Sequence, residues 1–418
     1  SIVDMLVVGN IVGETGLAAI SNASMISFII NSICIGVTMG GTVLIAQYKG
    51  ANDEQGQSET VGTLFAISLI ASFIVTIIGL IVYKPLFHIL NVTAASMQAA
   101  CEYMKIICCG TIFVFGYNAV CSIMKGFGDS KSPLYFVAIA TVVNIILDLI
   151  LVDPFNMGTA GAAYATIFSQ GVSLFISVIH LKRKKFVFDF KIKHFAIQSD
   201  KLITVLKVGL PTAIQMVIVN ISYLLITGML NYFGVSVAAA SGVGLKVNTF
   251  AGMPCWAIGQ AVTAMVGQNA GANDIERVRK TTKIGLYLNV SVTLIAIIIV
   301  QLFAEQIIML FEPESQEVIK DGVLYLRMCC GMYTFDSFAI GIGSANVAMI
   351  NAFLDAVFVR LSVSWILAFV IHIGFTGVYI GQAVSPVLPA IVGLIYFKTN
   401  SWEKKKLIHY AEGSVGQP

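Results

Sequence analysis

Long apolar stretches separated by short polar turns follow one another along almost the whole chain. Eleven of them contain 20 or more residues, the length that a helix needs to cross the hydrocarbon core of a bilayer. A twelfth, at the N-terminal end, is too short to cross, and we expect its helix to begin upstream of Ser1. The pattern predicts helices at residues 1–12 (partial), 17–46, 60–82, 100–124, 133–152, 159–181, 205–230, 237–267, 281–303, 322–342, 349–370 and 375–397.

Composition supports the same class of protein. Of the 418 residues, 57% are hydrophobic and 11% are charged, and the mean hydropathy is +0.87. In soluble domains about a quarter of all residues are charged. The eight cysteines all lie in or beside apolar runs without metal-ligand spacing, which indicates small core residues. The predicted fold class is therefore an all-α, polytopic membrane protein of twelve transmembrane helices.

Basic residues are segregated between alternate loops. The loops after the second, fourth, sixth and eighth helices and the C-terminal tail carry nineteen Lys and Arg residues, whereas the opposite loops carry two. Because basic loops stay on the cytoplasmic side, both termini are predicted to be cytoplasmic. The longest basic segment divides the chain into an N-terminal six-helix lobe at 1–181, a cytoplasmic linker at 182–204, a C-terminal six-helix lobe at 205–397 and a cytoplasmic tail at 398–418.

The two halves repeat one another. The segment QYKGAND at 47–53 matches QNAGAND at 268–274 with an offset of 221 residues, and Cys108-Cys109-Gly110 matches Cys329-Cys330-Gly331 at the same offset. Further along, Gly158 and Gly161 match Gly374 and Gly377 with an offset of 216, and Gly126 and Gly128 match Gly341 and Gly343 with an offset of 215. A six-helix unit is even, so both copies keep the same orientation in the membrane, and the repeat is predicted to be parallel.

Polar residues in the predicted fifth and sixth helices form the strongest candidate site. Asn144 and Asp148 stand four apart in an otherwise apolar run, which places both on one helix face. Thr166 follows in the next helix. A carboxylate within a membrane helix is costly and therefore indicates function. Carboxylate, amide and hydroxyl oxygens together suit a proton or a small hard cation.

The repeat assigns this site to the first half alone. The pair Asn351 and Asp355 has the same spacing, but it is out of register and we interpret it as a coincidence. Arg360 is predicted to pair with an acid such as Asp336 or Asp355. In register, the second-half counterparts of the first-half residues are Arg360 for Asn144, Ser364 for Asp148, Gln382 for Thr166 and Leu225 for Asp4.

The order of local motifs resembles the multidrug and toxic compound extrusion (MATE) family, prokaryotic type. The segments that carry the resemblance are DMLVVGNIVG at 4–13, KGFGDSKSP at 125–133, NIILD at 144–148 with MGTAGAAYAT at 157–166, VGLPTAIQ at 208–215 and VGQNAGA at 266–272. The resemblance implies a cation- or proton-binding site at Asp4, Asn144, Asp148 and Thr166. Some members place their acids in the C-terminal lobe, but here the seventh helix offers only Gln215 and Asn220.

The predicted function is a secondary-active multidrug exporter that exchanges amphipathic or cationic compounds for H⁺ or Na⁺ by alternating access. We expect no cofactor, no metal beyond Na⁺ at the cation site, no nucleic acid, and a monomer in the plasma membrane of a bacterium or archaeon, with small-molecule substrates and the bilayer as partners. Catalytic residues are lacking, so the chain is not expected to be an enzyme. The predicted cavity is apolar and aromatic, between helices 1, 2, 7 and 8, with candidate residues Met216, Asn220, Tyr223 and Phe250.

Two rival functions stay open. A flippase for a lipid-linked saccharide, found in the wider superfamily, would favour basic cavity residues, for which Lys246 and Arg360 are the only signals. A non-transporting receptor or scaffold would have no reason to keep Asp148 in the membrane.

Overall fold

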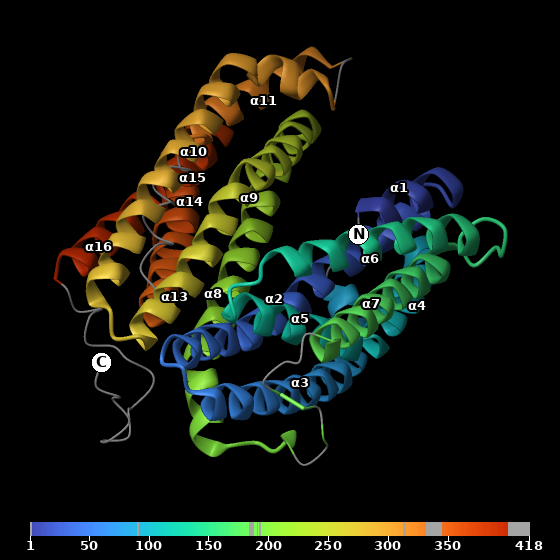
Figure 1. Ribbon diagram of the computed structural model, residues 1–418. Coiled ribbons are helices and arrows are strands. Elements are labelled where there is room, and N and C mark those ends of the chain that lie inside the picture. Colours follow the sequence, from blue (N-terminus) through green and yellow to red (C-terminus); the bar gives the residue numbers. More distant parts are fainter. Residues whose placement is uncertain are drawn as a thin grey trace. The chain divides into compact units, whose positions relative to one another are not determined.

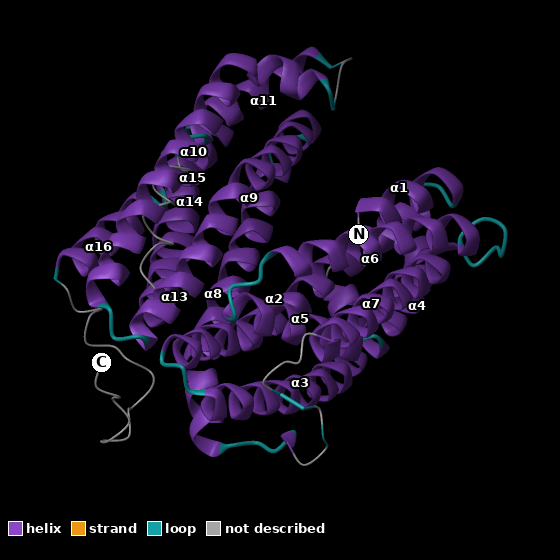
Figure 2. Cartoon of the chain, viewed as in Figure 1, coloured by secondary structure: helices purple, strands orange, loops and turns teal. Residues whose placement is uncertain are grey.

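A computed structural model describes residues 2–89, 92–183, 188, 189, 191, 194–311, 315–331 and 345–399 (Figure 1). Helices and connecting loops make up this described part of the chain, and no strand occurs in it (Figure 2). The helices are α1 (Ile2–Ile11), α2 (Glu14–Gly50), α3 (Glu54–Ile89), α4 (Ala94–Cys109), α5 (Thr111–Gly126), α6 (Lys131–Leu151), α7 (Gly158–Arg183), α8 (Ser199–Asn231), α9 (Val235–Gly271), α10 (Ile275–Met309), α11 (Gln316–Cys329), α13 (Ala345–Phe353), the π-helical η2 (Leu354–Leu361), α14 (Ser362–Trp365), the π-helical η3 (Ile366–Val370), α15 (Phe375–Val384) and α16 (Val387–Lys398).

Among the described residues, eight helical stretches are long and apolar enough to cross a membrane, or nine if α4 and α5 form one span. The remaining predicted spans correspond to α1, α9 and α11. The stretch 100–124, predicted as one helix, is bent by 48° at Gly110. A Cβ at Gly110 would lie 2.3 Å from Ile167 Cγ1, so α7 packs directly against the break. Residues 332–342 of the tenth predicted helix, and with them Asp336, Gly341 and Gly343, lie outside the described residues, as do residues 400–418 of the tail.

Backbone geometry repeats at the offsets found in the sequence. The glycines before α2 and α9, Gly13 and Gly234, have φ angles of 84° and 116°, which only glycine adopts readily. The turns after these two helices place Asn52 and Asn273 in the left-handed region, with φ angles of 55° and 60°. The aspartate that follows each asparagine then accepts a hydrogen bond from the backbone amide three residues later. Gly56 N donates to Asp53 Oδ1 at 2.8 Å, and Arg277 N donates to Asp274 Oδ1 at 2.9 Å. The repeat is therefore structural as well as sequential.

The turn that joins α6 to α7 also has a second-half counterpart. Gly158 and Gly374 have φ angles of 52° and 75°. A Cβ at Gly161 would lie 2.9 Å from the Leu151 carbonyl carbon, and one at Gly377 would lie 2.7 Å from that of Leu367. In both halves a glycine thus lets two successive helices approach backbone to backbone, which fixes the register between them.

The chain forms two compact units, residues 1–213 and 214–418. The division lies inside α8 because the first part of that helix packs on α2. A Cβ at Gly36 would lie 2.4 Å from Ala213 Cβ, and one at Gly40 would lie 2.2 Å from the Val205 carbonyl oxygen. The core of the second unit includes the edge-to-face pair Tyr325 and Tyr379, whose ring centroids are 4.9 Å apart.

Part of the predicted linker packs on the first unit. The Phe65 ring on α3 lies 6.2 Å from the Phe188 ring and 5.8 Å from the Phe195 ring, centroid to centroid. The backbone amide of Gln198 donates to Thr63 Oγ1 at 3.2 Å. The linker is therefore anchored on α3 by aromatic and hydrogen-bond contacts.

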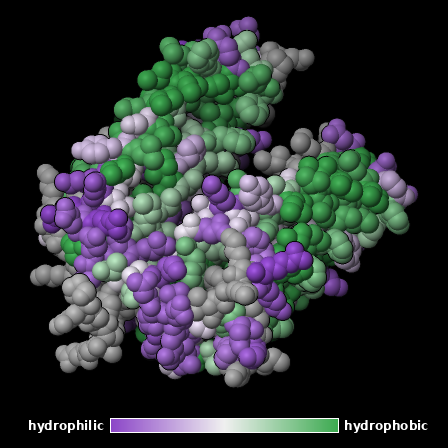
Figure 3. Space-filling model, viewed as in Figure 1, coloured by the Kyte–Doolittle hydropathy of each residue, from purple (hydrophilic) through white to green (hydrophobic). Residues whose placement is uncertain are grey.

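Large apolar side chains cover much of the outer surface, as the green areas of Figure 3 show. On α6 and α10, for example, Leu134 is 68% exposed and Tyr287 71% exposed. A soluble protein rarely exposes apolar surface so extensively. Exposed apolar side chains of this kind suit contact with lipid tails.

Candidate cation site

The inward face of α6 is a single stripe of residues spaced four apart. It runs through Ser132, Phe136, Ala140, Asn144 and Asp148, all buried, while most of the helix surface is exposed. The spacing follows from the helical period, which brings every fourth residue to one face. The predicted pairing of Asn144 and Asp148 on one buried face is thus present in the structure.

Asp4 on α1 is fully buried and accepts hydrogen bonds from side chains of two other helices. Thr166 Oγ1 on α7 donates to Asp4 Oδ2 at 2.9 Å, and the Tyr103 hydroxyl on α4 donates to the same oxygen at 3.0 Å. A carboxylate that receives two hydroxyl donors is stabilised in its charged form. Three helices therefore meet on one oxygen of Asp4.

Asp148 is the second acid of this cluster. Its side chain is fully buried and lies close to the Asp4 carboxyl group. No group of the described residues donates a hydrogen bond to either oxygen of Asp148. Two carboxyl groups can share a hydrogen bond only when one of them carries a proton. A proton or a cation between the two acids would satisfy this arrangement.

Asn144 completes the cluster. Its Nδ2 atom donates to Thr166 Oγ1 at 3.5 Å, so α6 and α7 are joined at the level of the acids. The contact depends on the close approach of the two helices at Gly161, five residues before Thr166. The structure therefore brings Asp4, Asn144, Asp148 and Thr166 together, and their role in binding an ion stays a prediction.

Tyr103 is the member of this cluster that sequence reasoning missed. It is buried among apolar neighbours on α4, which follows α1 by about ninety residues in the chain. Its only sequence signal is a hydroxyl group in an otherwise apolar helix face, and many buried tyrosines share that signal. Only the packing of α4 against the other helices shows its contact with Asp4.

The corresponding region of the second unit contains a neutral network. The Tyr325 hydroxyl donates to Gln382 Oε1 at 3.1 Å, and Asn248 Nδ2 donates to the Tyr325 oxygen at 3.2 Å. Gln382 is the register partner of Thr166. Ser364, the register partner of Asp148, is fully buried and donates to the Val378 carbonyl oxygen at 3.3 Å. These positions of the second unit carry no acid.

Asp355, a buried acid of the second unit, is paired with a base instead. Arg360 Nη2 and Asp355 Oδ2 are 2.5 Å apart in η2, as one of the two predicted pairings requires. The Arg360 guanidinium also lies 4.3 Å from the centroid of the Tyr223 ring on α8, and its Nε donates to Ser385 Oγ at 3.4 Å. Asn351 is also buried, one turn before Asp355. The ion pair of Arg360 and Asp355 is therefore a structural cross-link within the second unit.

The four cavity candidates lie on two helices of the second unit. Asn220 Nδ2 donates to the Met216 carbonyl oxygen at 2.9 Å on α8. Tyr223 is engaged by Arg360, and Phe250 on α9 is 58% exposed. Their assignment to a substrate cavity stays a prediction.

Comparison with known proteins identifies the family. The family model MatE matches residues 1–150 and 211–373, which is more than half of the chain. The chain belongs to the MatE family. This confirms the resemblance seen in its motifs. Because members of the MATE family are transporters, this MATE protein is a multi-pass membrane transporter and not an enzyme.

Relatives and solved structures agree over nearly the full length of this MATE protein. It is 26% identical to the "Probable multidrug resistance protein YoeA" of Bacillus subtilis, over 97% of this chain and 90% of that protein. It is 26% identical to the "Probable multidrug resistance protein NorM" of Thermotoga maritima, over 94% and 86% of the two chains. The solved structure described as the "outward-facing conformation of a multidrug resistance MATE family transporter of the MOP superfamily" matches with a TM-score of 0.89 at 23% identity, covering 97% of this chain and 92% of that one. The predicted fold class is confirmed.

Proposed function

We propose that this MATE protein is a secondary-active multidrug exporter that antiports amphipathic, mainly cationic compounds against H⁺ or Na⁺. The observation that carries the proposal is the pair of buried acids, Asp4 and Asp148, side by side within the first unit. Its relatives named for multidrug resistance support the same substrate class. The ion site consists of Asp4, Asn144, Asp148 and Thr166, with Tyr103 as a further donor.

The chemistry of the pair favours one bound proton or cation. Two adjacent carboxylates in a site without water repel each other strongly, so both are not ionised together unless a cation neutralises them. Asp4 already accepts bonds from Tyr103 and Thr166, which suits the ionised partner. Asp148 has no donor among the described residues, which suits the partner that takes up the proton. With Na⁺, the oxygens of both acids and of Asn144 would be the ligands.

Ion occupancy can act on helix packing through this site. Asp4, Tyr103, Asn144 and Thr166 come from α1, α4, α6 and α7, so a change of charge at the acids alters contacts of four helices at once. Coupling requires that the substrate binds the two resulting states with different affinity. Loss of one buried charge is large enough to shift such an equilibrium by several-fold or more.

Gradient-driven efflux from proteoliposomes tests the proposal. Purified protein is reconstituted, and export of a cationic dye is measured under an H⁺ gradient and, separately, under a Na⁺ gradient. Asp148→Asn is expected to abolish export under the driving gradient, whereas Arg360→Ala, matched for expression, impairs it less. Wild-type efflux by Asp148→Asn under both gradients would end the proposal.

The substrate candidates have a separate test. Met216→Ala, Asn220→Ala and Phe250→Ala are expected to weaken dye binding and export. Tyr223 is changed to Phe, which keeps a ring under Arg360 and so leaves the ion pair in place. Unchanged binding and export in all four variants would refute the assignment.

The flippase alternative loses support at one of its two basic residues. Arg360 is buried in an ion pair and is 3% exposed, so it does not present a free charge to a phosphate. Lys246 is exposed on α9. The exporter therefore remains the function that the site supports best.

A further inference from the structure

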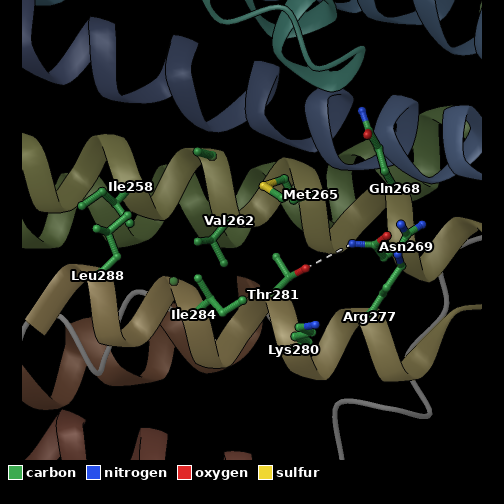
Figure 4. A pocket seen from close by; sticks show the side chains of 12 residues that line it. Ile258, Val262, Met265, Gln268, Asn269, Arg277, Lys280, Thr281, Ile284 and Leu288 are labelled. Atoms are coloured by element: carbon green, nitrogen blue, oxygen red, sulfur yellow. Dashed lines mark hydrogen bonds between the residues drawn. The ribbon is translucent and has the colours of Figure 1, made fainter.

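A cavity of about 550 Å³ lies within the second unit, between the end of α9 and the beginning of α10. One end of it is apolar and is lined by Ile258 and Leu288, and the other end is polar and is lined by Asn269, Arg277 and Lys280 (Figure 4). Residues on both sides are open to the surroundings, since Met265 is 53% and Ile284 56% exposed. We call this cavity the α9–α10 groove.

The floor and the polar end of the groove are fixed by contacts between the helices. A Cβ at Gly285 would lie 2.3 Å from Val262 Cγ2, so the two helices touch below the groove. At the polar end Asn269 Nδ2 donates to Thr281 Oγ1 at 3.3 Å (Figure 4). The groove is thus held by the fold and does not depend on an occupant.

Two basic side chains stand at this polar end. Arg277 and Lys280 lie three apart at the beginning of α10 and are exposed. The nearest ion-pair partner of Arg277 is Asp274, with Nε 3.8 Å from Oδ2. An exposed pair at that distance is weak and does not prevent Arg277 from binding an anion. The groove therefore joins a positive end to an apolar floor.

The equivalent place in the first unit is closed by the linker. At the offset of 221, Lys280 corresponds to Glu59, Ile284 to Thr63 and Asn269 to Tyr48. Thr63 Oγ1 accepts from Gln198 N, and Lys201 Nζ lies 3.6 Å from Glu59 Oε2 and 2.6 Å from the Tyr48 hydroxyl. The linker thus covers the corresponding place in the first unit, where Lys201 pairs with Glu59.

The second unit carries Lys280 where the first unit carries Glu59. The chain has a tail segment, KLIHYA at 406–411, that matches KIKHFA of the linker at 191–196 with an offset of 215. This segment follows two further lysines, Lys404 and Lys405, and like charges would repel it from Arg277 and Lys280. Glu59 in the first unit attracts a basic segment, whereas Lys280 at the same position favours an anionic occupant.

We propose that the α9–α10 groove binds an anionic phospholipid. The phosphate lies between Arg277 and Lys280, and one acyl chain lies along Val262, Met265 and Ile284. The basic loops of this side are predicted to be cytoplasmic, where anionic headgroups attract Lys and Arg residues near a membrane surface. Lipid chemistry matches both ends of the groove, the positive end and the apolar floor.

Native mass spectrometry of the full-length protein in detergent tests the proposal. Dioleoyl phosphatidylglycerol and dioleoyl phosphatidylcholine are titrated separately onto wild type, onto the double variant Arg277→Gln/Lys280→Gln and onto a charge-matched control, Lys207→Gln/Lys283→Gln. Both control lysines are exposed and do not line the groove. A third variant, Ala261→Phe, fills the groove without changing the charge.

The expected result is specific to phosphatidylglycerol. The groove double variant loses about 30-fold in affinity, because each basic residue near an anionic headgroup contributes roughly fivefold. The control pair loses about threefold or less, and Ala261→Phe also weakens binding. Equal losses in the two double variants would show general charge attraction and overturn the proposal. Unchanged binding by Ala261→Phe would overturn it too, because no acyl chain would then enter the groove.

Discussion

Asp355 and Arg360 form a buried ion pair although they stand five residues apart on one helix. In an α-helix, residues five apart point roughly 140° away from each other. The segment from Leu354 to Leu361 is π-helical, and its wider i to i+5 turn brings such residues closer to the same face. The wider turn is therefore what makes the pair, and the pair in turn fixes η2 against Tyr223 on α8.

Substituting one member of this pair is predicted to destabilise the protein more than substituting both. Arg360→Met or Asp355→Leu alone should lower the free energy of unfolding by roughly 3–5 kcal/mol, because each leaves a buried charge without its partner. The double variant should lie within about 1 kcal/mol of the wild type, or above it. Thermal unfolding in detergent measures the cycle. Lys246→Met, which removes an exposed base on α9, is the control and should leave the stability almost unchanged. A double variant that loses as much stability as the two single variants together would contradict the prediction.

Tyr103→Phe is predicted to weaken ion coupling without unfolding the protein. The ring stays buried, but Asp4 loses the Tyr103 hydroxyl as a donor. A hydrogen bond to a charged group contributes about 1.5–3 kcal/mol, so the ion concentration for half-maximal efflux should shift by roughly tenfold or more. Tyr117→Phe is the matched control, since the Tyr117 hydroxyl donates to the Pro133 carbonyl oxygen away from the acids. Identical ion dependence in wild type and Tyr103→Phe would exclude this role of Tyr103.

Gly161→Ala is predicted to disturb the site through helix packing. The added Cβ would lie 2.9 Å from the Leu151 backbone, so α7 must move away from α6 and carry Thr166 away from Asn144. Overpacking of this kind costs about 1–3 kcal/mol. Gly171→Ala on the same helix is the control, because its Cβ would meet Phe113 at an ordinary 3.6 Å. Stability and efflux are measured together, and equal behaviour of the two variants would argue against the close approach as the determinant.

Asp189→Asn is predicted to loosen the linker at neutral pH. The Lys191 ammonium, 2.8 Å from Asp189 Oδ2, and the His194 ring hold the pKa of this carboxyl well below its usual range. A lowered pKa means that the contribution of Asp189 is complete above its ordinary pKa of about 3.9 and is lost as the pH falls below it. Hydrogen exchange of residues 194–198 should therefore rise at neutral pH in the variant. Asp153→Asn, an exposed aspartate in another turn, is the control and should leave the exchange of this segment unchanged.

The sequence by itself determined the class of the protein, its helices and its repeat. Apolar length and loop charge are local properties, and the conserved spacing of GAND and CCG within the chain is directly countable. The helical period was also enough to place Asn144 and Asp148 on one buried face. The sequence-based prediction that Arg360 pairs with an acid is confirmed for Asp355, although the spacing of five residues gave no reason to choose it over Asp336.

Tertiary structure decided the contacts between elements distant in the chain. No local period relates the residues that meet in these contacts. Examples are the hydrogen bond from Tyr103 to Asp4, the proximity of Asp148 to Asp4 and the packing of Phe195 on α3. An α-helical pattern also cannot predict the π-helical turn that brings Arg360 to Asp355, because this turn shifts the phase of every later side chain. Local periodicity fixes which face of a helix is buried, whereas only packing fixes which groups meet on that face.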